Sequence, residues 1–228
     1  YGNRIGIIDE PNQPAQPMMD MTYGSFAAKA KAMAKGFEEL GVAHQGRVAM
    51  VSHNASRMLT FLFGTAAWGR IGVPINFRLN HEEISYIIEH SGAEVLIVDP
   101  ELEDTLKEVK VKHFFCMGRD SDEVLFKAGE PTPWVPDEDA TATINYTSGT
   151  TARPKGVEMT HRMLWTNAAI FGWQTGVNDR DVYLHTLPMF HCNGWGYPWT
   201  IPMLNGRTIC LRNIDVKKIF ELIDKHNV

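Results

Sequence analysis

Two kinds of hydrophobic pattern alternate along the chain. After Thr22, apolar residues recur at steps of four and three, which is typical of one buried face of a helix. Short β-branched runs such as 94–99 are typical of strands covered on both faces of a sheet. The pattern predicts strands at 47–52, 72–77, 94–99, 113–118, 141–147, 181–188 and 207–212, and helices at 23–40, 55–69, 81–90, 101–109 and 215–227, with another after Thr160.

Residues that favour helix starts stand before these helical segments. Thr22, Asn54 and Thr160 each precede one, and their side-chain oxygens are predicted to accept a backbone N–H bond as N-caps. Asn80 with Glu83 three residues later has the spacing of a capping box. In the final amphipathic helix, the residues expected to share one apolar face are Val216, Ile219, Phe220 and Ile223.

The alternation of strands and helices predicts the fold class. It favours parallel βαβ units and therefore an α/β fold, doubly wound, with mostly parallel sheets flanked by helices. Residues 119–139 are rich in proline and acidic residues, so we expect a surface excursion or linker there, and a domain subdivision near 119–140 is one alternative. Ligands of such sheets bind beyond the carboxyl ends of the strands.

Composition narrows the class of protein. The 228 residues are 44% hydrophobic and 21% charged, typical of a soluble globular protein, and the net charge of −5 argues against a nucleic-acid partner. Three cysteines without CxxC spacing favour reduced thiols and a cytoplasmic protein. No apolar run has membrane-spanning length, and no signal peptide is recognised. The assembly is left open, with a homodimer as one alternative.

The segment NYTSGTTARPKGVEMTH, residues 145–161, carries the strongest chemical signal. It is not the P-loop of nucleoside triphosphatases, because the second glycine and the final hydroxyl of that motif are replaced by Pro154 and Gly156. Glycines, hydroxyls and one lysine after a buried strand nevertheless suit phosphate, and a helix N-terminus was expected close behind the loop. The alternative is a surface turn with an exposed lysine.

The stretch YTSGTTARPKGV closely resembles the phosphate loop of the adenylate-forming superfamily, which includes acyl-CoA synthetases, luciferases and peptide-synthetase adenylation domains. The resemblance extends over essentially the whole chain. MTYGSFAAKAKAMAKGFEELGV is similar to the family's early helix, and HTLPMFHCNGWGYPW is similar to the segment that lines the acyl pocket in fatty acyl-CoA synthetases.

This resemblance implies a reaction and a set of site residues. Members of the family activate a carboxylate with ATP and Mg²⁺ to an acyl-adenylate, and coenzyme A then displaces AMP. The residues implied to hold the β- and γ-phosphates are Thr147, Ser148, Gly149, Thr150, Thr151 and Lys155. His191 is implied to lie beside the substrate carboxylate as the catalytic residue. Ala152 departs from the glycine that the family usually has there.

The resemblance also implies the kind of acid. PMFHCNGWG lacks the aspartate that holds the substrate ammonium in amino-acid adenylation domains, so Met189, Phe190 and Trp195 are expected to edge an apolar acyl pocket. Trp199 is better explained as core packing. His185, His191 and Cys192 lack a fourth ligand and a zinc spacing, and no metal site is expected in this chain.

Two classes of function remain. The first is an AMP-forming fatty acyl-CoA synthetase, with an aryl- or short-chain acid ligase as the alternative within that chemistry. The second is a nucleotide-binding or structural module without catalysis. The chain, 1–228, is expected to be the N-terminal portion of an AMP-binding domain. The adenine, ribose and magnesium contacts and the small C-terminal domain are expected beyond Val228, so the piece alone should be inactive.

Overall fold

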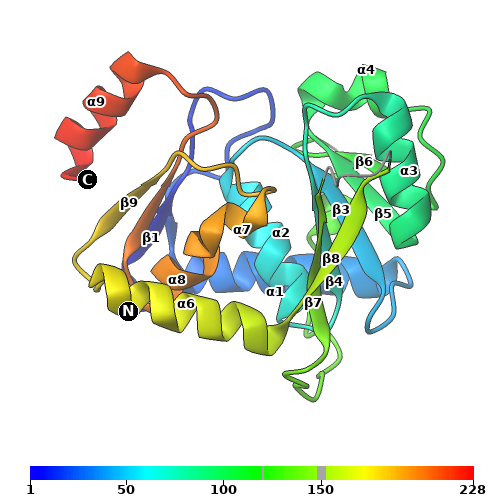
Figure 1. The fold of residues 1–228 in the computed structure, drawn as a ribbon, viewed down its shortest axis with the longest axis horizontal. Coiled ribbons are helices and arrows are strands. Elements are labelled where there is room, and N and C mark those ends of the chain that lie inside the picture. Colours follow the sequence, from blue (N-terminus) through cyan, green and yellow to red (C-terminus); the bar gives the residue numbers. More distant parts are fainter. Residues whose placement is uncertain (120, 148–152) are drawn as a thin grey trace.

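The computed structural model describes residues 1–119, 121–147 and 153–228, which build two sheets (Figure 1). The larger sheet has the order β6-β5-β3-β4-β7-β8 and the smaller has the order β2-β1-β10-β9. The strands of the larger sheet are β3 (Arg47–Val51), β4 (Ile71–Ile75), β5 (Ala93–Val98), β6 (His113–Cys116), β7 (Thr141–Thr147) and β8 (Lys155–Thr160). Those of the smaller sheet are β1 (Ile5–Ile8), β2 (Met21–Thr22), β9 (Val182–His185) and β10 (Arg207–Cys210).

Both sheets are parallel except at one edge each, where β8 runs antiparallel to β7 and β2 runs antiparallel to β1. Helices separate the sheets and cover them (Figure 1). They are α1 (Tyr23–Glu39), α2 (Ser56–Ala66), α3 (His81–Ser91), α4 (Glu103–Leu106), α5 (Asp122–Leu125), α6 (His161–Thr175), α7 (Cys192–Trp195), α8 (Tyr197–Met203) and α9 (Val216–His226), with a 3₁₀ turn at Pro100–Leu102. The predicted fold class, mostly parallel sheets flanked by helices, is confirmed.

The central strands of the larger sheet are buried on both faces, as their β-branched composition predicts. Val48 and Met50 of β3 face the core between the two sheets, where α1 and α2 pack. Ala49 and Val51 of the same strand face the second core, beneath α3. The side chains of successive residues point to opposite faces of a strand, so one short apolar run serves two cores.

Three of the four predicted helix caps are confirmed. Thr22 and Thr160 accept N–H bonds at the starts of α1 and α6, and Asn80 forms a capping box with Glu83. Asn54 is different, because α2 follows Ala55 and has no side-chain cap. The Asn54 amide instead donates to the carbonyls of His185 and Leu187, at 3.0 and 2.8 Å, and joins α2 to the segment after β9.

Two other expectations need correction. The helix predicted at 101–109 is only a 3₁₀ turn followed by the four residues of α4. The buried face of α9 differs from the predicted one. Val216 and Phe220 are exposed, whereas Ile219 and Leu222 pack against the smaller sheet. Within the described part of 119–139, α5 is the one helix, and the segment otherwise fits the predicted surface excursion.

Candidate functional site

The glycine- and threonine-rich loop joins β7 to β8, so its ends are fixed by a hairpin. Thr147 is paired with Lys155 at the loop end of this hairpin, and both side chains are exposed. The predictions for Ser148, Gly149, Thr150 and Thr151 lie outside the described residues, as does Ala152. The described ends of the loop therefore place one hydroxyl and one ammonium group side by side.

The helix after Thr160 is present, but the prediction that its N-terminus lies close behind the loop is wrong. Residues 155–160 form β8, and Thr160 pairs with Thr141 at the far end of the hairpin. Because a strand rises about 3.4 Å per residue, α6 begins roughly 17 Å from Lys155. Its dipole cannot support an anion held at the loop.

Contacts with α3 hold the described end of the loop instead. The Arg153 guanidinium lies 5.4 Å from the ring centre of Tyr86, and the Tyr86 hydroxyl donates to the carbonyl of Pro154 at 3.4 Å. The neighbouring Tyr146 hydroxyl lies 2.8 Å from Nδ1 of His90. Burial, with Tyr86 nearby, raises the pKa of Tyr146 to about 12, so its hydroxyl stays protonated at neutral pH.

A left-handed turn follows His191 and carries Trp195. Every residue from Cys192 to Gly196 has a positive φ, between 46° and 83°. Glycine adopts this conformation readily and asparagine tolerates it, but Cys192 and Trp195 are strained there by about 1–3 kcal/mol each. Such a turn persists only when neighbouring structure holds it.

Buried amides provide that support. The side-chain amide of Asn193 accepts from Asn145 Nδ2 at 3.1 Å and donates to the Thr143 hydroxyl at 3.0 Å. Asn145 Nδ2 also donates to the carbonyl of Phe190 at 3.1 Å. Sequence reasoning did not single out these three residues. The available signal was a threonine and an asparagine at buried positions of a strand whose other buried residues, Ala142 and Ile144, are apolar.

A cavity of about 600 Å³ opens between the end of β7, the left-handed turn and α6. We call it the site cavity. It brings together Thr147, His191 and Trp195, which were predicted for three different tasks. Asn167 and Phe171 of α6 form its opposite wall. His191 and Trp195 are exposed, as groups that meet a ligand must be before it binds.

Other predicted site residues lie elsewhere. Met189 is fully buried in the core between the sheets, and Phe190 packs its ring edge-on against Phe77 at 5.4 Å; neither lines the site cavity. Trp199 packs against the core, as expected. Among the described residues, no carboxylate lines the cavity, and no group of three or more metal-ligating side chains is found. None of the described helices combines the length and hydropathy needed to cross a bilayer.

Known proteins are similar to this chain in sequence. The family model described as "AMP-binding enzyme" matches residues 7–228. The acetate/butyrate–CoA ligase AAE7 of Arabidopsis thaliana is 33% identical over 92% of this chain and 42% of its own length. The 4-hydroxybutyrate–CoA ligase 2 of Metallosphaera sedula is 33% identical over 91% of this chain and 42% of its own length.

Solved structures share the fold. The inhibitor-bound N-terminal domain of FACL13 from Mycobacterium tuberculosis superposes with a TM-score of 0.83 at 32% identity, over 92% of this chain and 55% of that one. A long-chain-fatty-acid CoA ligase structure from Rhodopseudomonas palustris gives a TM-score of 0.90 at 23% identity, over 100% of this chain and 58% of that one. The chain spans less than half the length of the curated relatives named above. It belongs to the AMP-binding enzyme family.

Proposed function

We propose that the complete protein is an AMP-forming acid–CoA ligase. A carboxylate oxygen attacks the α-phosphorus of ATP and pyrophosphate leaves, which gives an acyl-adenylate. The thiol of coenzyme A then attacks the acyl carbon, and AMP leaves. The observation that carries the proposal is the site cavity, which unites Thr147 of the phosphate loop with His191 and Trp195 of the acyl segment.

Each residue has a task in this proposal. Thr147 and Lys155 hold phosphate oxygens at the loop end of the hairpin, and Ser148, Gly149, Thr150 and Thr151 complete the loop between them. The loop offers hydroxyls and a cation, which suit a polyphosphate. No carboxylate among the cavity's described lining residues offers itself to a metal ion. Mg²⁺, when bound, would neutralise phosphate charge. No protein ligand for it is assigned among the described residues.

His191 is proposed to act at the substrate carboxylate. It precedes the left-handed turn and lines the cavity a short way along the chain from Trp195. A ring nitrogen there can donate to an oxygen whose charge changes during adenylation, and such positioned donors contribute most in sites that exclude water. Trp195 forms part of the wall around the acid's tail, and the roles first given to Met189 and Phe190 rest on the family resemblance alone.

The acid is proposed to be apolar and small to medium in size. Lining residues without a carboxylate cannot hold an amino-acid ammonium by charge, and a cavity of about 600 Å³ lies in the ordinary range for ligand sites. Relatives of 31–33% identity are named for acetate, butyrate, 2-methylpropanoate and benzoate. They favour the short-chain or aryl alternative over the medium- or long-chain fatty acid that was expected first.

The cell compartment and the assembly stay predictions. Several plant relatives carry "peroxisomal" in their names, so the peroxisome is the alternative to the cytoplasmic location that was expected. A homodimer has no observation that favours it.

The function is tested by acid-dependent release of pyrophosphate from ATP by the full-length protein, across acids from acetate to dodecanoate and including benzoate. Lys155→Ala should lower adenylation on the order of 10- to 100-fold, because it removes a charge-assisted contact worth about 1.5–3 kcal/mol. Lys217→Ala is the matched control, since that side chain is 88% exposed on α9. Pyrophosphate release that needs no acid would show ATP hydrolysis instead of acid activation, and no release with any acid would favour a nucleotide-binding module without catalysis.

A further inference from the structure

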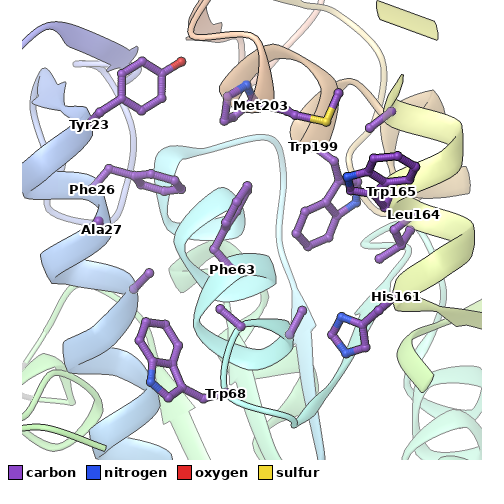
Figure 2. A pocket seen from close by; sticks show the side chains of 15 residues that line it. Tyr23, Phe26, Ala27, Phe63, Trp68, His161, Leu164, Trp165, Trp199 and Met203 are labelled. Carbon is purple, nitrogen blue, oxygen red and sulfur yellow. The ribbon is translucent and has the colours of Figure 1, made fainter. Parts of the chain in front are cut away.

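A second cavity lies on the other flank of α6. Its volume is about 500 Å³, and it is enclosed by α1, α2, α6 and α8. We call it the helix groove. In Figure 2 the rings of Phe26, Phe63 and Trp199 project into it from three helices, and His161 and Leu164 project from α6. In the part of the chain that the structure describes, no lysine, arginine or carboxylate lines the groove, so its chemistry suits an aliphatic group.

One side chain belongs to the walls of both cavities. Leu164 lines the site cavity on one flank of α6 and the helix groove on the other. It is 9% exposed and packs with Ala66 and Ala142 in a small cluster. Met159, which lines the site cavity, and Trp199, which lines the groove, pack against the same cluster.

Leu164 and its cluster therefore lie between the two cavities. The two other buried members of the cluster are alanines, so Leu164 has the largest side chain of the three. Alanine side chains have no rotamers with which to fill a gap, and a core that loses a large side chain relaxes only partly. Removal of the Leu164 side chain should leave an opening rather than a collapsed seam.

We infer that Leu164 determines the length of acid that the site accepts. This inference rests on the proposed function and adds a specificity residue to it. The tail of a short acid fits within the site cavity, and the tail of a longer acid meets Leu164. The helix groove is the apolar compartment that a longer aliphatic tail enters once this side chain is small.

The test is a profile of kcat/KM against acid length for the full-length enzyme, from acetate to tetradecanoate. Leu164→Ala should move the optimum to longer acids, and activity should rise about fourfold for each further methylene that becomes buried. Ala27→Trp in the Leu164→Ala background should abolish this gain, because Ala27 is an exposed residue of α1 that lines the groove. Ala28→Trp is the matched control, since Ala28 is also exposed on α1 but does not line the groove.

The outcomes separate the groove from simple enlargement of the site cavity. A shift that survives Ala27→Trp would overturn the role of the groove, and an unchanged optimum in Leu164→Ala would overturn the inference as a whole. If Leu164→Ala loses activity with every acid, Leu164→Val is scored in the same way, with a smaller shift expected. A wild-type enzyme that adenylates short acids while the variants show no shift refutes the inference but not the proposed function. A wild type inactive with every acid refutes the proposed function, and the inference with it.

Discussion

His191 and Trp195 face the same cavity but stand in different relations to a bound acid. We predict that His191→Ala lowers kcat/KM by on the order of 10- to 100-fold for every acid alike, because all acids share the carboxylate. Trp195→Ala should instead change the ranking of acids, because this 55% exposed side chain meets the tail. Trp173→Ala is the control, an 86% exposed tryptophan of α6 outside the cavity lining. A uniform loss in Trp195→Ala would mean that its role is wrongly assigned.

A second residue-scale prediction concerns His185, which is fully buried and has no partner for either ring nitrogen among the described residues. Burial lowers the pKa of His185 to about 3. The unfolded chain takes up a proton below about pH 6.5 and the folded one does not, so stability is full above that pH and falls below it. The expected slope from this residue is about 1.4 kcal/mol per pH unit between about pH 6 and 3.

The measurement is the free energy of unfolding in urea at pH 7.5 and pH 5.5 for the wild type and His185→Leu. The variant should lose the part of the pH dependence that His185 contributes, whatever its absolute stability. An identical pH dependence in both proteins would show that His185 is not kept neutral by burial.

At the scale of elements, the left-handed turn depends on β7 behind it and on α6 in front of it. Gly196 has a φ of 83°, and a Cβ atom placed there would lie 1.9 Å from Oδ1 of Asn167 on α6. Gly196→Ala should therefore cost the roughly 1 kcal/mol of a left-handed alanine and, in addition, displace the exposed Asn167 side chain from the wall of the site cavity, which should lower kcat/KM.

Gly176→Ala provides the matched comparison for this prediction. Gly176 has a φ of 68°, but no atom lies within 4 Å of a Cβ placed there, so only the backbone strain of about 1 kcal/mol is expected. The two variants are compared by urea unfolding and by kcat/KM. Equal losses in both would mean that the contact with Asn167 relaxes without consequence.

At the scale of the whole molecule, a buried ion pair joins the two sheets. Arg212, which follows β10, donates to both carboxylate oxygens of Asp99, which follows β5, at 2.6 and 2.9 Å. Their side chains are 4% and 0% exposed. Arg212→Ala leaves a buried carboxylate without its cation, and we expect a loss of about 3–5 kcal/mol in the free energy of unfolding.

Arg162→Ala is the control for this ion pair. Arg162 also contacts two carboxylates, but its side chain is 53% exposed, and such surface pairs contribute about 0–1 kcal/mol. Adding Asp99→Asn to Arg212→Ala should restore part of the stability, because it removes the unpaired charge. A loss in Arg212→Ala no larger than in Arg162→Ala would show that the pair does not hold the sheets together.

Much of the fold follows from local patterns that a single sequence contains. A strand such as 94–99 needs only a short apolar run, and the caps at Thr22, Asn80 and Thr160 need only one or two residues at fixed spacing. These features depend on backbone geometry over a few residues, so they are readable without the rest of the molecule. The motif at 145–161, which is proposed to bind phosphate, is equally local, because its residues are contiguous in the sequence.

Long-range contacts decided the rest. Residues 155–160 form a strand because they pair with the edge of β7. The Asn54 side chain does not cap its helix, because it donates to the carbonyls of His185 and Leu187 after β9. Met189 and Trp195 belong to one sequence motif, yet Met189 is buried in the core and Trp195 borders the site cavity. The reason is the left-handed turn that includes Trp195, which Asn145 of a distant strand holds in place. The sequence by itself determined most of the helices and strands and the family to which the chain belongs. Only the tertiary structure decided which side chains share a cavity, because that depends on how elements far apart in the chain pack.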